Sequence, residues 1–278
     1  MATSVQTKNL KKTTKTVLVN SRERDFSKYP SPGSYVIDLP RTYNNVIGAH
    51  MASAEVPFSF YSFTAALGNT TLNLDVNGTT RSITIPDGTY SFSSVSTALA
   101  SALNTAFSVE TYVFGVSVSP ETGKLTIQCT NLPASTTLRI DNTTGPDWGL
   151  AYFLGFPNDM VTVGATNTGT LTGHNVCVLN PYTYLVLDIQ ELNGTDHVGV
   201  SGGNSAFGKI PLNLPSINFV LYDKVLSKQT FNPPRLQVNK LHVSFKFPDG
   251  NPVDFQGAEH SFTIELVCTD EKMVSRSY

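Results

Sequence analysis

The chain has few charged residues and few cysteines for its length. Only 14% of its 278 residues are Asp, Glu, Lys or Arg, against roughly 25% in ordinary soluble domains. A weakly charged surface of this kind indicates that much of it meets other protein. The three cysteines are Cys129, Cys177 and Cys268. They are widely spaced without a Cys-x-x-Cys motif, which predicts buried thiols made in a reducing compartment.

Long apolar runs and catalytic motifs are also missing. No run of 18 apolar residues occurs, so we expect neither a membrane-spanning helix nor a signal peptide. A Gly-x-Ser-x-Gly pattern occurs around Ser201, but it lacks the strand-turn-helix context of a catalytic nucleophile, and the five histidines are scattered. We therefore predict no metal, no cofactor and no enzymatic activity. The sequence leaves open a pair of carboxylates brought together from distant strands, as in a glycosidase.

One Gly/Ser-rich loop, residues 193–207, invites a functional interpretation. A phosphate-binding loop would need a lysine and a following helix, and the sequence offers neither. We interpret the segment as a flexible connector.

Basic residues are concentrated at the start of the chain. Residues 1–16 contain Lys8, Lys11, Lys12 and Lys15 and no acidic residue, whereas the remainder holds 15 basic and 21 acidic residues. We predict a basic N-terminal arm over 1–16, either solvated or docked on acidic protein, an anionic membrane or nucleic acid. Removing residues 2–15 is expected to leave the body folded and to weaken assembly in a salt-dependent manner.

Most of the remaining sequence alternates apolar and polar residues. Leu241, Val243, Phe245 and Phe247 share one face of a predicted strand, and similar rows begin at Leu185 and Phe262. Period-2 alternation predicts half-buried antiparallel strands whose inner faces meet a second sheet. The fold class is therefore mainly β, an antiparallel β-sandwich.

One segment follows helical spacing instead. Val95, Leu99 and Leu103 recur at intervals of four, and Ser91 or Ser93 can cap the start. This predicts a single helix over about 91–107, inside an α+β module that spans 66–173. We expect this module to be inserted into a sandwich formed by residues 17–65 and 174–270, followed by a C-terminal tail over 271–278.

Three blocks of sequence resemble a known group of proteins. They are Asn20 to Asp25 with the later Ala54-Glu-Val-Pro57, the stretch from Ile85 to the Leu154-Gly-Phe156 segment, and the carboxy end from Leu241 to Thr263. In this order they resemble minor capsid proteins of large icosahedral nucleocytoplasmic DNA viruses of the giant and algal virus type.

The resemblance implies a jelly-roll fold and a place in the virion. The implied function is a structural minor capsid protein that bridges or cements major capsomers, made and assembled in the host cytoplasm. The implied partners are the major capsid protein and other minor capsid proteins, with the inner viral membrane or a membrane protein as a further candidate and no specific nucleic acid. Alternatives are a penton or vertex component, and a carbohydrate- or receptor-binding β-sandwich.

A charged cluster near the start is the second candidate interface beside the lysines. Arg22, Arg24 and Asp25 lie between two predicted strands. They are interpreted either as an inter-subunit salt-bridge patch, since Arg can pair bidentately with a carboxylate, or as an ordinary solvated turn.

Overall fold

The protein divides into two compact units. Its structure, a computed structural model, describes residues 11–140, 149–156, 160–163, 167–197, 204–212, 219–222 and 228–269. Unit 1 comprises Met1–Phe60 with Tyr182–Tyr278, and unit 2 comprises Tyr61–Pro181. The predicted tail, 271–278, lies outside the described residues, and the proposed domain roles stay predictions.

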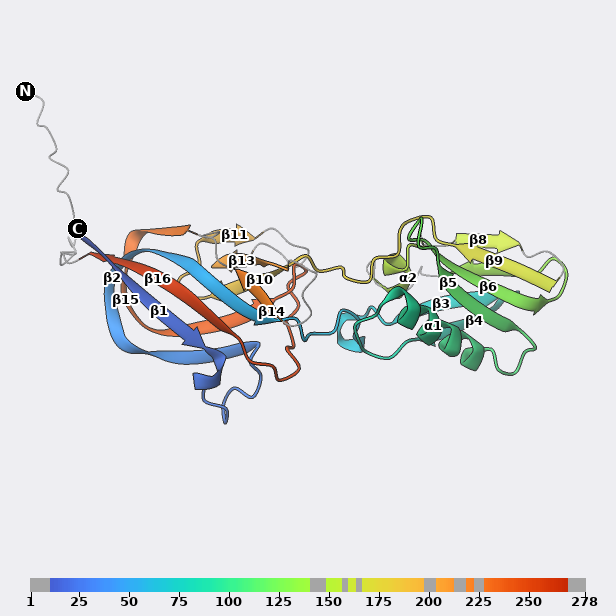
Figure 1. The fold of residues 1–278 in the computed structure, drawn as a ribbon, viewed down its shortest axis with the longest axis horizontal. Helices are drawn as coiled ribbons and strands as arrows, with labels where there is room; N and C mark the ends of the chain where they lie inside the picture. The colour runs from blue at the N-terminus through green and yellow to red at the C-terminus, as the bar shows by residue number, and fades with distance from the viewer. Residues whose placement is uncertain are drawn as a thin grey trace, which may run out of the picture. The chain divides into compact units, whose positions relative to one another are not determined.

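Unit 1 is an antiparallel β-sandwich (Figure 1). Seven strands pair in the order β1-β16-β2-β15-β10-β13, with β14 also on β2, and β11 pairs with β12. Their bounds are β1 (Lys12–Asn20), β2 (Ser34–Pro57), β10 (Tyr184–Ile189), β11 (Thr195–His197), β12 (Asn204–Ala206), β13 (Gly208–Pro211), β14 (Phe219–Tyr222), β15 (Lys228–Lys246) and β16 (Ser261–Thr269), with the 3₁₀ turn η1 (Ser21–Glu23) after β1.

Two long strands, β2 and β15, belong to both layers of this sandwich. The first part of β2 pairs with the end of β15, whereas its second part lies between β16 and the start of β15. The register of β2 with β15 shifts between Thr230 and Arg235 and again between Val238 and Lys240. Such bulges bend strands, and both strands curve around the left end of unit 1 in Figure 1. Phe245 of β15 then meets Phe262 of β16 across the core, with ring centroids 6.5 Å apart.

The position of β1 shortens the predicted N-terminal arm. The arm was predicted over 1–16, but β1 begins at Lys12 and pairs with β16 along its whole length, from Lys12 opposite Thr269 to Asn20 opposite Ser261. Lys12 and Lys15 therefore belong to the sandwich.

The strand β10 differs from the expected half-buried pattern. Residues 185–189 are buried on both faces, Asp188 included. Lys246 Nζ donates to Asp188 at 2.6 Å, and a small cavity between Val186, Asp188 and Ser205 shows that β12 and its neighbours cover the outer face. The loop interpreted as a flexible connector thus contributes β11 and β12 to the fold; its residues 198–203 lie outside the described part.

Unit 2 contains the predicted helix and two small sheets. One sheet has the order β4-β3-β7-β8 and the other β5-β6-β9. The bounds are η2 (Ala65–Leu67), β3 (Thr71–Val76), β4 (Thr79–Thr84), α1 (Phe92–Ala106), β5 (Val113–Val118), β6 (Leu125–Leu132), β7 (Thr137–Ile140), α2 (Leu150–Phe153), β8 (Met160–Val163) and β9 (Asn167–Thr172). The one-turn helix α2 was not predicted, because its four residues are too few to show a helical period.

The helix α1 forms for the reasons read from its sequence. Ser91 caps it: its side chain accepts from the backbone N–H of Ser94, whose own side chain accepts from the backbone N–H of Ser91. Val95, Leu99 and Leu103 are fully buried in the core of unit 2. The predicted fold class, a mainly antiparallel β-sandwich with an inserted helix-containing module, is confirmed.

Candidate interaction surface

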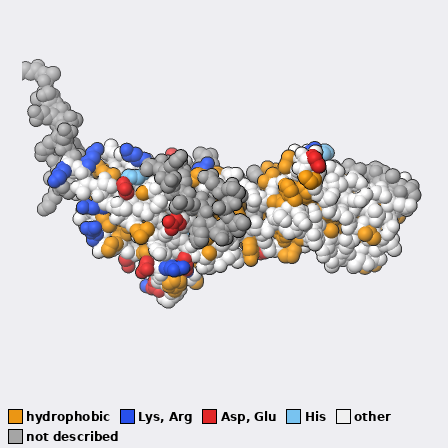
Figure 2. Space-filling model, in the orientation of Figure 1, with side chains coloured by type: hydrophobic (Ala, Val, Ile, Leu, Met, Phe, Trp, Pro, Cys, Tyr) orange, Lys and Arg blue, Asp and Glu red, His pale blue; other side chains and the backbone are white. Residues whose placement is uncertain are grey.

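The predicted lysines lie at or near the first strand. Lys8 is outside the described residues. Lys11 and Lys12 are exposed at the start of β1, while Lys15 is half-buried and shares the inward face of the strand with Val17 and Val19. Figure 2 shows Lys and Arg side chains gathered at this end of unit 1.

Arg24, the second predicted arginine, is committed to the fold. Its side chain is 2% exposed and forms an ion pair with Glu259 at 2.5 Å. The guanidinium also donates to the carbonyl oxygens of Ser21 at 2.7 Å, Tyr29 at 2.8 Å and Pro30 at 3.1 Å. Its placement in an inter-subunit patch is therefore corrected: every one of these partners is internal, and the side chain does not reach the surface.

The carboxylate that pairs with Arg24 is held by a second group. Glu259 also accepts from the Ser21 hydroxyl at 2.5 Å. Burial raises the pKa of Glu259, but the hydrogen bonds from Arg24 and Ser21 and the charge of Arg24 outweigh burial and bring it below the ordinary range. The result is a latch between the β1–β2 turn and the segment before β16.

Arg22 and Asp25 are exposed on the same turn. Asp25 accepts from the backbone and hydroxyl of Ser27 and pairs with Lys28 at 3.2 Å. These bonds, with that of Ser27 first, lower the pKa of Asp25. Local pairs of this kind are worth little to stability, so Arg22 and Asp25 remain surface groups.

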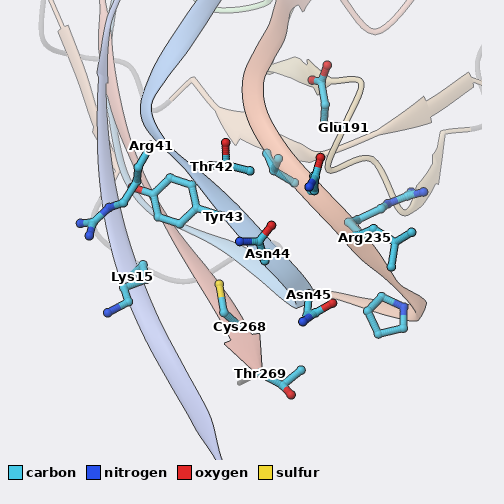
Figure 3. A pocket seen from close by; sticks show the side chains of 14 residues that line it. Lys15, Arg41, Thr42, Tyr43, Asn44, Asn45, Glu191, Arg235, Cys268 and Thr269 are labelled. Atoms are coloured by element: carbon cyan, nitrogen blue, oxygen red, sulfur yellow. The ribbon is translucent and has the colours of Figure 1, made fainter. Parts of the chain in front are cut away.

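A large groove opens where β2 and β15 bend. Its volume is about 1170 Å³, and it lies across four strands, β1, β16, β2 and β15 (Figure 3). Buried Tyr43, Val238 and Cys268 form its floor. Lys15, Arg41, Glu191 and Arg235 supply its charges, and Asn44, Asn45, Gln237, Thr42 and Thr269 supply polar side chains.

Of these charged groups, only Lys15 was singled out from the sequence. Arg41 and Arg235 are almost 200 positions apart and meet because β2 and β15 pair, with Gln237 opposite Asn44. No local motif marks such a site.

The described residues show no arrangement typical of metal binding. Among them, no group of three or more His, Cys, Asp or Glu side chains is close enough to hold a metal ion. The three cysteines are buried thiols, as predicted. Burial raises the pKa of Cys129 to about 12 and that of Cys177 to about 11, so neither is a reactive thiolate at neutral pH.

Within the part of the chain described, no helix is long and apolar enough to cross a membrane.

Comparisons with known proteins identify a family and a viral capsid protein of similar sequence. Residues 5–145 match the model of a family of unknown function, DUF5901. The penton capsid protein P1 of Paramecium bursaria Chlorella virus 1 is 35% identical over 96 residues, which cover 32% of this chain and 56% of that protein. The match thus spans about half the length of the curated relative.

A solved structure matches almost the whole chain. The crystal structure of the mavirus penton protein superimposes with a TM-score of 0.51 at 13% identity, covering 93% of this chain and 98% of that one. At this identity the match shows a shared fold. The sequence match to the Chlorella virus capsid protein, together with this shared fold, confirms the resemblance to capsid proteins of large DNA viruses that the sequence blocks indicated.

Proposed function

The chain belongs to the DUF5901 family, and on that premise we propose that it is a structural capsid protein of penton type, placed at the fivefold vertices of a large DNA virus. The observation that carries the proposal is the 35% identity with a penton capsid protein. The shared fold with a second penton protein supports it. This vertex role was the alternative interpretation of the sequence, and it now has more support than the bridging or cementing role.

A penton role requires surfaces through which identical copies of the protein can bind one another. In a ring of five identical copies, each copy meets its two neighbours through two different, complementary surfaces. A basic patch on one copy that faces an acidic patch on the next would form such a complementary pair of surfaces. The role we propose is structural rather than catalytic, with other capsid proteins as partners and the virion as location.

Copy number separates a vertex component from a lattice cement. A penton predicts about 60 copies per icosahedral particle, five at each of twelve vertices, and a pentamer of the purified protein. Quantitative mass spectrometry of virus particles, with the major shell protein as internal standard, and native mass spectrometry of the purified chain measure both. A copy number that scales with the number of major capsomers would contradict the penton proposal.

We further propose that Lys8, Lys11, Lys12, Arg22 and Asp25 contact a capsid neighbour, and that Lys15 takes part from the groove. The start of β1 limits the deletion to residues 2–10, which contain Lys8, because removing residues 2–15 would also remove four of the nine residues of a paired strand. Deleting residues 2–10 should leave the melting temperature unchanged and weaken assembly most at low salt, where charge attraction is least screened.

The matched variant is Lys11→Glu with Lys12→Glu, which keeps the chain length and reverses two charges. Both variants should show a salt-dependent loss in a sedimentation assay of assembly, and the double reversal should show the larger one, because it reverses two charges whereas the deletion removes Lys8 alone. Normal assembly of the doubly reversed protein would remove these lysines from the interface.

A further inference from the structure

We propose that the groove across β1, β16, β2 and β15 is a docking site for an extended acidic peptide segment of another protein. That the partner is a neighbouring capsid protein rests on the proposed function; that the groove binds acidic peptide does not.

The groove combines an apolar floor with a basic rim. Tyr43, Val238 and Cys268 are 5%, 1% and 9% exposed and lie at its base. Arg41 and Arg235 are exposed, and Lys15 is half-buried. An extended segment can lay alternate side chains on such a floor while its carboxylates meet the rim.

The three cations have no carboxylate partner among the described residues. Arg41 lies over the ring of Tyr43, 5.6 Å from the centroid. Arg235 lies over the ring of Phe231 at 5.1 Å and donates weakly to the Asn193 carbonyl at 3.4 Å. Lys15 forms no ion pair or side-chain hydrogen bond within the described part of the chain. Each guanidinium therefore keeps donors for bidentate pairing with an incoming carboxylate.

Glu191, the one acidic side chain among the described residues that line the groove, is already engaged. Both oxygens of Glu191 face His242: one accepts from its backbone N–H at 2.9 Å, and the other is 2.5 Å from Nδ1. Glu191 thus neither pairs with the groove arginines nor cancels their charge fully, and the groove is complementary to negative charge.

The same features favour a peptide over a nucleic acid. Single-stranded nucleic acid needs exposed aromatic faces on which bases stack, but the Tyr43 ring is buried and its face is covered by Arg41. Leu236, which is 66% exposed beside Arg235, offers contact to an apolar side chain instead.

Fluorescence anisotropy with the full-length protein tests the proposal. The probe is a short labelled peptide in which glutamate alternates with valine, and the control probes carry lysine in place of glutamate or are an oligothymidylate. We expect the acidic peptide to bind and the lysine peptide not to bind. Arg41→Glu with Arg235→Glu should weaken binding at least tenfold, and the neutral pair Arg41→Gln with Arg235→Gln should weaken it less.

A matched control carries the same change in charge elsewhere. Lys124→Glu with Lys209→Glu reverses two lysines that do not line the groove and should leave peptide affinity within twofold. Circular dichroism and the melting temperature check that all variants are folded. Equal losses in both double variants would reduce the effect to net charge and overturn the proposal, as would absence of peptide binding at low salt or preferential binding of the oligonucleotide.

Truncating the chain after Thr269 tests whether its own C-terminal acidic residues occupy the groove. Asp270 and Glu271 directly follow Thr269, a groove residue. Unchanged peptide affinity in the truncated chain supports a site for another protein, whereas a large gain would assign the groove to the chain's own tail. These assays use no virus particles, so their failure is distinct from a failure of the copy-number test.

Discussion

Replacing Arg24 by alanine is expected to lower the free energy of unfolding of unit 1 by about 3–5 kcal/mol, the cost of leaving one member of a buried ion pair without its partner. The change removes the cation beside Glu259 and the donors to three carbonyl oxygens, those of Ser21, Tyr29 and Pro30. Each buried polar group left without a partner adds to the loss.

Two further variants show whether the loss of stability comes from the burial of Arg24 and not from its charge alone. Arg22→Ala removes the same side chain two positions earlier, where it is exposed, and should change stability by less than about 0.5 kcal/mol. Arg24→Lys keeps the charge but lacks the planar fork that reaches four acceptors, so it should recover only part of the loss.

Urea unfolding followed by pulse-labelling mass spectrometry of β15 and β16 peptides reports unit 1 alone. Equal, small effects of Arg22→Ala and Arg24→Ala would contradict the assignment of Arg24 to the fold. A loss of assembly in folded Arg24→Ala protein, without loss of stability, would restore it to an interface.

The parts of the fold that are encoded locally could be predicted from the sequence. Helix α1 carries its cap at Ser91 and its buried stripe at Val95, Leu99 and Leu103 within one segment. The alternation in β15 and β16 likewise shows which residues face the core. Each of these signals needs only neighbours in sequence, because period and capping are local properties.

The features that depend on pairing between distant segments could not be predicted. Arg24 looks like part of an exposed charged turn until Glu259, 235 positions later, is placed beside it. The groove needs residues from four strands, and the burial of Asp188 needs β12 on the outer face of β10. A charged residue in the sequence does not indicate whether its partner is water, another residue of this chain or another protein.

Acid is expected to weaken unit 1 through His260, the second large effect. The imidazole is 3% exposed and packs against the rings of Tyr35, Phe245, Phe255 and Phe262. Its Nε2 is 2.9 Å from the Pro32 carbonyl, which can only accept, so Nε2 carries the proton. Nδ1 is buried and has no hydrogen-bond partner, and a second proton there would have no acceptor.

The pKa of His260 determines in which direction the stability of unit 1 changes with pH, and over which pH range. Burial lowers it from 6.5 to about 4, aided by the charge of Arg24 and opposed by the hydrogen bond to Pro32 and by Glu259. Below pH 6.5 the unfolded chain therefore binds a proton that the folded protein refuses. Stability is full above that pH and is lost as the pH falls toward 4, by about 2 kcal/mol between pH 7.5 and pH 5.

Glu259 acts in the same direction but at lower pH. Its folded pKa lies below the ordinary 4.5, so its contribution is lost only as the pH falls below about 4.5. A loss of stability between pH 7.5 and pH 5 therefore reports His260, and a further loss below pH 4.5 reports the latch with Arg24. The two windows let one pH series separate a buried neutral ring from a buried ion pair.

His260→Gln isolates the titration from the packing. Glutamine keeps a donor for the Pro32 carbonyl but has no proton to gain, so this variant should be less stable at pH 7.5 and lose little more by pH 5. The control, His174→Gln, changes an exposed histidine of unit 2 and should keep the full pH dependence of unit 1. Urea unfolding with the same β15 and β16 peptides measures both. If His260→Gln lost stability with acid as steeply as the parent chain, the pH dependence would have to come from other groups, and the neutral buried ring would not be its cause.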